Sequence, residues 1–158
     1  MWTWTICAGR KDFALKKDVM ITIKGIQFAD NDQDSVELTT VGRLYRRGEA
    51  YYICYNESEA TGFDGAKTTL KVEGDRRVTM RRTGENMRSQ LIIEKGQRHQ
   101  CVYDTGFGTM MLGISGDDIV SCLNDAGGHL QVRYTLDVNA SMASENELQV
   151  DVEEYYPS

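Results

Sequence analysis

The chain has 158 residues, of which 41% are hydrophobic and 27% are charged, and it contains one proline. This length suits a single domain with its own core, and the composition excludes proline-rich disorder. No apolar run approaches the roughly 18 residues of a membrane-spanning helix. The net charge of −6 argues against a surface that attracts nucleic acid throughout.

The first residues lack the pattern that dominates the rest of the chain. The apolar piece Trp2–Ala8 precedes its positive charges, which is the reverse of a secretory signal. Two interpretations stay open: translation starts at Met20, or residues 1–18 form a genuine edge strand or tail. We therefore expect an N-terminal extension over 1–18, untranslated or disordered, one domain over 19–154 and a tail over 155–158.

Alternation of apolar and polar residues, interrupted by glycines, predicts antiparallel β-strands along almost the whole chain. The predicted strands are 19–28, 35–46, 50–57, 66–72, 76–82, 87–93, 97–104, 107–114, 117–124, 128–138 and 147–154. A single short helical turn is predicted between Asn139 and Glu145.

The side chains of the middle strands can be assigned to faces by parity, because paired strands must turn their apolar sets to the same side. Pairing Leu70 with Val78, and Val78 with Leu91, leaves turns of three and four residues, and both lengths suit hairpins. The residues of 76–82 that this register points inward are Val78, Met80 and Arg82.

Most of these strands have one apolar and one polar face, as in an antiparallel sheet with one solvated side. Leu130, Val132 and Tyr134 share one face of their strand, for example, while Gln131 and Arg133 share the other. Strands in such a meander favour an all-β, up-and-down barrel, because closure removes exposed edges.

Four short motifs, in order and spacing, are similar to those of the YwiB-like family, small bacterial proteins of unknown function. The motifs are Gly62–Thr69, Arg82–Gly84, Tyr103–Gly108 and Tyr134–Asn139. The resemblance spans roughly 19–154 and implies a lipocalin-like (calycin) barrel, here of about eight to ten strands, in the cytosol. It implies no activity and no catalytic residues.

The four cysteines are far apart and have no metal-ligand spacing with histidine. We interpret them as reduced, buried thiols of a cytoplasmic protein. No cofactor and no metal are predicted.

A first candidate site lies inside the barrel, where Arg82 and Tyr103 point inward near one end and Tyr134 adds a second phenol. A guanidinium beside phenols suits a small, partly apolar anion, and a barrel of this size holds one small ligand. The alternative is that Arg82 bonds a glutamate or backbone carbonyls at the rim and that the interior is packed.

A second candidate is a basic outer face. Its residues are Lys67, Lys71, Arg77, Arg81, Arg88 and Arg98. Cations that face one another across strands repel, so this surface favours an anionic protein partner, RNA, or the acidic C-terminal strand of a second copy. The absence of stacking aromatics weakens the RNA interpretation. The alternative is a solvated face whose charges prevent aggregation.

A third candidate is the aromatic strand Tyr51–Tyr55, followed by an acidic loop over 56–65 that suits a lid, although a plain strand and crossover explain both. An enzyme at the barrel mouth ranks last, because His99 and His129 are the only histidines and no catalytic set accompanies them. The leading function is therefore non-catalytic ligand binding, followed by protein or RNA docking and then by catalysis.

Overall fold

The computed structural model describes residues 13–59, 64–85, 88–104, 108–138 and 141–156, and all of its named elements are β-strands. They are β1 (Leu15–Ala29), β2 (Asp32–Arg47), β3 (Ala50–Asn56), β4 (Lys67–Glu73), β5 (Arg77–Thr83), β6 (Arg88–Glu94), β7 (Arg98–Asp104), β8 (Thr109–Asn124), β9 (Gly127–Val138) and β10 (Ser141–Glu154).

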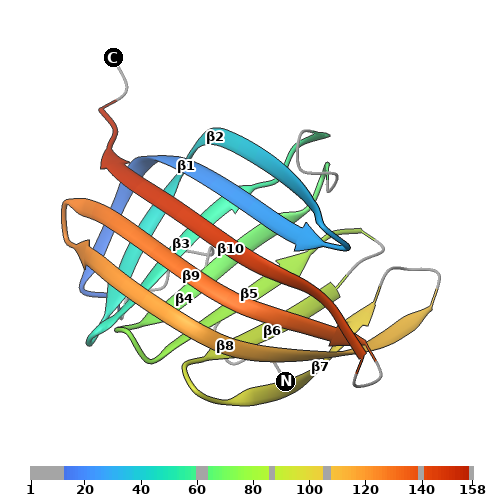
Figure 1. Ribbon diagram of the computed structural model, residues 1–158. Helices are drawn as coiled ribbons and strands as arrows, with labels where there is room; N and C mark the ends of the chain where they lie inside the picture. Colours follow the sequence, from blue (N-terminus) through green and yellow to red (C-terminus); the bar gives the residue numbers. More distant parts are fainter. Residues whose placement is uncertain (1–12, 60–63, 86–87, 105–107, 139–140, 157–158) are drawn as a thin grey trace.

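Each strand pairs with its neighbours in sequence, and β1 pairs with β10, so the sheet closes into a barrel (Figure 1). All pairs of neighbouring strands are antiparallel, and the predicted all-β, up-and-down barrel is confirmed. The connections after the odd-numbered strands share one end of the barrel, which we call the mouth. The connections after the even-numbered strands share the other end, which we call the base.

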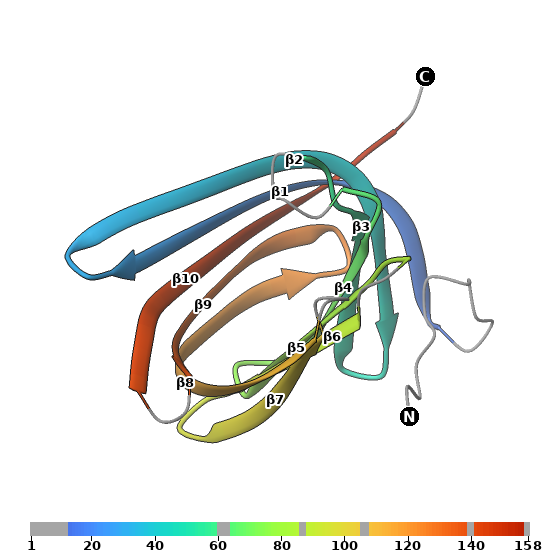
Figure 2. The same cartoon turned by 90° about the vertical axis from the view of Figure 1, so that its right-hand side faces the viewer.

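The β1–β2 hairpin is longer than the alternation predicts, and it projects beyond the other strands (Figure 2). Its turn consists of Asp30 and Asn31, whose φ values are 50° and 65°. Two consecutive residues with positive φ are typical of the type I′ turn, whose twist matches that of the flanking strands. Pairing therefore continues to Ala29 and Asp32, where the sequence predicts a loop.

Strand β8 is a single strand, where the alternation predicts one strand over 107–114 and another over 117–124. A bulge between Gly116 and Asp118 explains the break in the pattern, because it inserts an extra residue and shifts the alternation. Gly116 also meets the β6–β7 turn closely: its N–H donates to Gln97 O at 3.0 Å, and its own carbonyl accepts from Gly96 N.

The predicted faces of the middle strands are correct, but the predicted register is wrong by two residues. Leu70 pairs with Met80 rather than Val78, and Met80 in turn pairs with Leu91. Each turn lies one residue later than predicted, so Glu73 and Arg77 close the β4–β5 hairpin as an ion pair. A slip of two residues preserves parity, which is why the inward set survives.

The predicted helical turn is also wrong where it can be seen. Residues 139–140 lie outside the described residues, and Ser141–Glu145 belong to β10, where they pair with the end of β9. The ladder satisfies more backbone groups than one isolated turn does. No helix in the described ranges has the length and apolar character of a membrane span.

The predicted boundary at residue 18 also needs correction. Residues 1–12 lie outside the described part, but β1 begins at Leu15, and Ala14 N donates to Arg46 O at 2.8 Å. Residues 15–18 therefore belong to the barrel. At the other end β10 stops at Glu154, as predicted.

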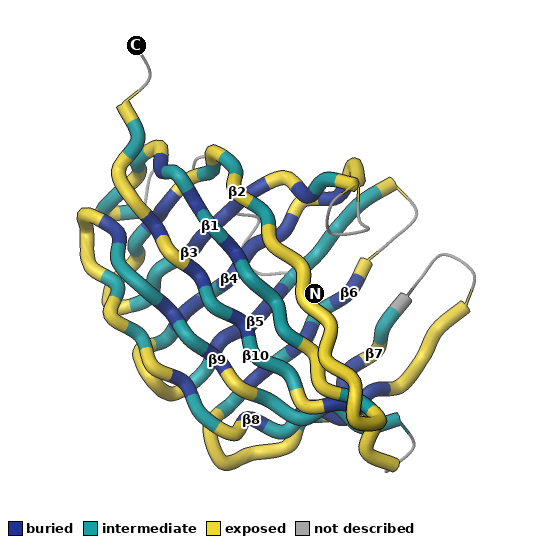
Figure 3. The backbone as a smooth tube through the Cα atoms, turned by 45° about the horizontal axis from the view of Figure 1, so that its top comes forward, coloured by how far each residue is buried: buried dark blue, intermediate teal, exposed yellow. Residues whose placement is uncertain are grey.

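Inside the barrel the base half is packed with aliphatic side chains, and the mouth half combines apolar and polar ones. Buried and exposed residues alternate along most strands (Figure 3). The inward residues toward the base are aliphatic, among them Val19, Leu44, Ile53, Val72, Val78, Ile93, Leu130, Val132, Val150 and Val152. Toward the mouth the same faces also carry polar groups, among them Thr68, Arg82 and Ser89. The core therefore forms the floor of a cup.

Candidate functional site

Arg82 is the central polar residue of the cup. It lies near the mouth end of β5, on the same inward face as Val78 and Met80, because residues two apart on a strand share a face. Its side chain is only 13% exposed. A guanidinium buried to this extent needs partners, since an unpaired buried charge is costly.

The partners of Arg82 are Glu57, which follows β3, and Thr68 of β4. Nη2 and Nε of Arg82 lie 3.2 and 3.3 Å from Glu57 Oε2, and Nε lies 3.2 Å from Thr68 Oγ1. Thr68 in turn donates to Glu57. Glu57 follows β3 directly and is held there by its N–H bond to Ala66 O at 2.8 Å. Its side chain is 1% exposed, so this is a buried ion pair at the rim.

Two tyrosines face the same charges. Burial, reinforced by the Glu57 carboxylate, raises the pKa of Tyr55 far above its ordinary value of 10, although Arg82 opposes the shift. Burial also raises the pKa of Tyr134, again against the lowering effect of Arg82. Both phenols therefore stay protonated at neutral pH, and that of Tyr55 is already hydrogen-bonded to Glu57 and Thr68.

A cavity of about 300 Å³ opens between these groups and the opposite wall of the barrel. Its lining comes from β1, β2, β9 and β10 on one side and from β3, β5 and Glu57 on the other. The apolar members of the lining are Ile23, Ile26, Val36, Met80 and Leu148, and the polar members include Gln27, Asp34, Tyr55, Glu57, Arg82, Tyr134, Asn146 and Glu147. The cup therefore has an apolar floor and a polar rim.

The structure brings together two of the three residues predicted for the ligand site. Arg82 and Tyr134 line the same cavity. Tyr103 packs against the inner core, but it is not part of that lining. Arg82 pairs with Ser89, and Ser89 pairs with Tyr103, so two strand spacings separate Arg82 from Tyr103. The predicted register pairs Arg82 with Met87, which lies outside the described residues, whereas the structure pairs Arg82 with Ser89.

The sequence prediction missed the acidic partner of Arg82. From the sequence, Glu57 is one of several acids in a loop, and a glutamate at the rim is only a general alternative. In the predicted register Thr68 faces inward opposite Met80, whereas in the structure it pairs with Arg82. The one available signal for Glu57 is its position two residues after Tyr55, which gives both side chains the same inward direction.

The aromatic strand itself has the predicted faces. Ile53 and Tyr55 belong to the inner core, whereas Tyr52 and Cys54 form a second cluster with Tyr45. Residues 60–63 of the loop that suits a lid lie outside the described residues.

Several members of the predicted basic face have acidic partners. Arg77 Nε lies 2.7 Å from Glu73 Oε2, and Arg98 Nη2 lies 2.8 Å from Asp137 Oδ1. Lys71 Nζ lies 5.9 Å from the centre of the Tyr52 ring. Lys67 and Arg88 are exposed, and Arg81 is half-buried. Carboxylates of the same barrel thus neutralise part of the positive charge for which the sequence suggests an external partner. Docking of a partner on this face stays a prediction.

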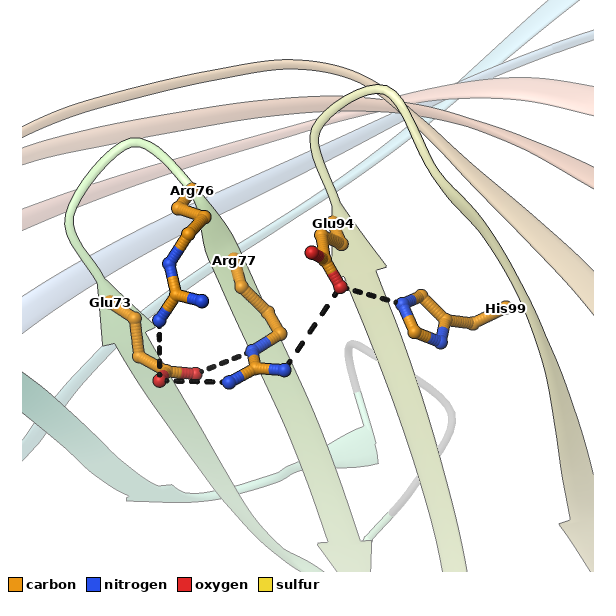
Figure 4. Close-up of polar contacts among 5 residues, drawn as sticks. All are labelled: Glu73, Arg76, Arg77, Glu94 and His99. Atoms are coloured by element: carbon orange, nitrogen blue, oxygen red, sulfur yellow. Dashed lines mark hydrogen bonds and ion pairs between the residues drawn. The ribbon is translucent and has the colours of Figure 1, made fainter.

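The ion pair of Glu73 and Arg77 continues through Glu94 to His99. Figure 4 shows Glu73 and Arg77 facing each other, with Arg77 Nη1 4.0 Å from Glu94 Oε1 and His99 Nε2 2.9 Å from the same oxygen. The described β6–β7 ladder has only two pairs, both at the mouth end. The Glu94–His99 contact therefore ties these strands together where the backbone ladder has ended, which is a structural role.

The remaining chemistry-bearing residues do not assemble into a site. No group of three His, Cys, Asp or Glu residues in the described ranges is placed to hold a metal ion. Cys54 and Cys101 are buried, as predicted, but Cys122 is exposed because it lies on the outer face of β8. Cys7 lies outside the described residues.

Comparison with known proteins gives the same fold and no activity. The chain is 26% identical over 126 residues to a protein of Bacillus subtilis (strain 168) described as "Uncharacterized beta-barrel protein YwiB", covering 78% of this chain and 86% of that one. The crystal structure of the ywiB protein from Bacillus subtilis superposes with a TM-score of 0.80 at 21% identity, over 92% of this chain and 96% of that chain. A family model described as "Domain of unknown function (DUF1934)" matches residues 21–150, and the chain belongs to this family.

Proposed function

We propose that this protein binds one small, partly apolar molecule in the cup. The observation that carries the proposal is the cavity of about 300 Å³ between Arg82 and the opposite wall. Small-molecule sites are concave, mostly apolar and equipped with a few convergent polar groups, and their volumes begin in this range. The apolar floor takes the body of the ligand, and the rim takes its polar end.

The charges on the rim bear on the class of ligand. Glu57 already neutralises Arg82, and Asp34 adds a further acid to the lining, whereas the Glu147 side chain faces outward and bonds Gln149. An anion, the class expected from the sequence, has to compete with Glu57 and approach these acids. An uncharged polar end avoids both costs. We therefore propose an uncharged head group, with Tyr134 as its hydrogen-bond donor.

The test uses three probes that share an eight-carbon chain: octanol, octanoate and octylammonium. Calorimetric titration of the full chain should show octanol binding more tightly than either charged probe. The Tyr134→Phe variant should weaken octanol binding by about 1 kcal/mol, the typical value of one neutral hydrogen bond. The matched variant Tyr103→Phe, outside the lining, should leave binding unchanged.

Each alternative has its own signature in the same experiment. Tighter binding of octanoate would return the anion as the preferred ligand class. Equal losses in Tyr103→Phe and Tyr134→Phe would mean that the probes bind elsewhere than in the cup.

A further inference from the structure

The mouth half of β2 has a neighbouring strand on one side only. Its residues Asp32–Val41 pair with β1, whereas the ladder to β3 begins at Gly42, opposite Tyr55. No other strand of the described ranges pairs with this part of β2. In Figure 2 it forms the upper edge of the projecting hairpin. Such an edge presents unpaired backbone N–H and C=O groups, to which another extended chain can bind.

The two-residue turns at the ends of β2 determine which residues carry these groups. The residues that flank such a turn form a hydrogen-bonded pair, here Ala29 with Asp32 and Arg47 with Ala50. Hydrogen-bonded pairs alternate along an antiparallel ladder, so the even-numbered residues of β2 bond to β1 and the odd-numbered ones face away from β1. The edge-facing residues of the unpaired half are therefore Gln33, Ser35, Glu37, Thr39 and Val41.

This edge is accessible and regular. All five edge-facing residues are exposed. The N–H of Ser35 donates to Asp34 Oδ1 at 3.1 Å, which agrees with a direction away from β1. Of the features that usually protect an edge from pairing, Asp34 and Glu37 supply charge, but 32–41 contains no proline, no lysine and no bulge. The edge can therefore accept a further strand.

The charge of the hairpin selects the partner. Between Gly25 and Gly42 the chain has no lysine or arginine, and its acids there are Asp30, Asp32, Asp34 and Glu37. The net charge of the whole chain is −6. A second copy paired edge to edge would bring two acidic hairpins together, and like charges on neighbouring strands repel. A basic segment is attracted instead.

We propose that β2 binds an extended, basic segment of another protein, which adds as an antiparallel strand beside Gln33–Val41. The partner's side chains opposite Glu37 and Thr39 lie on the outer face, because Leu38 between them packs against the inner core. Lysine or arginine at these positions meets the Glu37 carboxylate. The inference is independent of the ligand proposed for the cup, because it depends on backbone groups of the β2 edge.

Amide hydrogen exchange in the full chain tests the free edge itself. The N–H groups of Glu37, Thr39 and Val41 should exchange at least tenfold faster than those of Leu38 and Thr40, which bond to β1. Equal protection of both sets would overturn the proposal. So would protection of the edge-facing set that disappears on dilution, because a second copy would then occupy the edge.

The binding probe is an alternating lysine–valine octapeptide with blocked ends and a fluorescent label. It should bind the full chain, slow the exchange of the edge-facing amides, and bind less tightly as salt is added. N-methylation of its lysines removes the N–H groups that face β2 and should abolish binding, whereas N-methylation of its valines should leave binding intact. Equal binding of both methylated peptides, or of a glutamate–valine octapeptide, would overturn the proposal.

Variants of the protein separate backbone from charge. Thr39→Pro removes one edge-facing N–H without taking a bond from β1, and it should weaken binding about fivefold, the effect of one neutral hydrogen bond. Its matched control Thr39→Ala should bind like the parent. Glu37→Lys should weaken binding about tenfold, whereas Glu49→Lys, the same charge change at the exposed β2–β3 turn, should have little effect. Equal losses in the two lysine variants would overturn the proposal.

Discussion

Glu57 and Arg82 form a buried ion pair at the mouth of the barrel, with Glu57 Oε2 3.2 Å from Arg82 Nη2. The pair joins the connection after β3 to the wall formed by β5, with Thr68 of β4 bonded to both. The pair fixes the connection after β3 against the wall of the cup. Because Glu57 neutralises Arg82, it also weakens the attraction between the guanidinium and a ligand in the cup.

The first prediction concerns the stability that depends on this pair. Arg82→Met should lower the free energy of unfolding by about 3–5 kcal/mol, because the Glu57 carboxylate is left buried without its cation. The double variant Glu57→Gln/Arg82→Met should lose less than the sum of the two single changes, since it leaves no buried charge. Urea unfolding of all four proteins gives the coupling energy.

The exposed pair formed by Lys95 and Asp118 is the matched control for that cycle. Lys95→Met should change stability little, because solvent screens an exposed pair. Additive effects of the Glu57 and Arg82 substitutions would show that the two side chains are not coupled.

The second prediction contrasts two glycines of β8. A Cβ at Gly116 would lie 2.2 Å from the backbone oxygen of Glu94, which cannot move without displacing the β6–β7 turn. Gly116→Ala should therefore cost about 1–3 kcal/mol, the typical cost of overpacking. At Gly113 the nearest atoms are the flexible ends of Arg98 and Asp137, so Gly113→Ala should cost less. Thermal unfolding compares them, and an equal loss in both would contradict the close approach at Gly116.

The third prediction concerns acid stability. Hydrogen bonding by Arg77 holds the pKa of Glu73 below its ordinary value of 4.5. A depressed folded-state pKa stabilises the protein fully above pH 4.5, and this contribution is lost as the pH falls below that value. Glu73→Gln should lower the free energy of unfolding by roughly 0.5–1 kcal/mol near pH 6. The difference between variant and parent should shrink toward pH 3. Urea midpoints across this range measure it, with exposed Glu37→Gln as the control.

The fourth prediction concerns alkaline pH. Burial raises the pKa of Tyr55 above its ordinary value of 10, so the unfolded chain ionises first. The free energy of unfolding should therefore fall as the pH rises above 10, and Tyr55→Phe should make this fall shallower. Replacement of the exposed Tyr156 by phenylalanine should leave the slope unchanged. The same slope in Tyr55→Phe and in the parent would show that Tyr55 does not cause the loss.

The barrel and its two faces are predictable from the sequence because side-chain parity survives errors in register. Val78, Met80 and Arg82 face inward as predicted, although each of their partners is two residues away from the expected position. Turn positions decide the register, and the predicted β4–β5 turn is Glu73–Asp75. In the structure Glu73 pairs with Arg77, so the turn is Gly74–Arg76.

The site is less predictable because its key contact is neither local nor periodic. Arg82 and Tyr134 are recognisable as polar groups on apolar faces, but 25 residues separate Arg82 from Glu57. From the sequence, Glu57 is only one of the acids in the loop that suits a lid. Burial of a charge depends on the position of its partner, which follows from the closed topology and not from the strand pattern.

Titration of the full chain with octanol, followed through the methyl signals of methionine, tests the account most directly. Met80 lines the cup, and Met142 is exposed on β10 outside that lining. The account predicts saturable shifts of the Met80 methyl signal while that of Met142 stays in place. A Met80 signal that does not move in the folded protein, or equal shifts of both methyl groups, would contradict it.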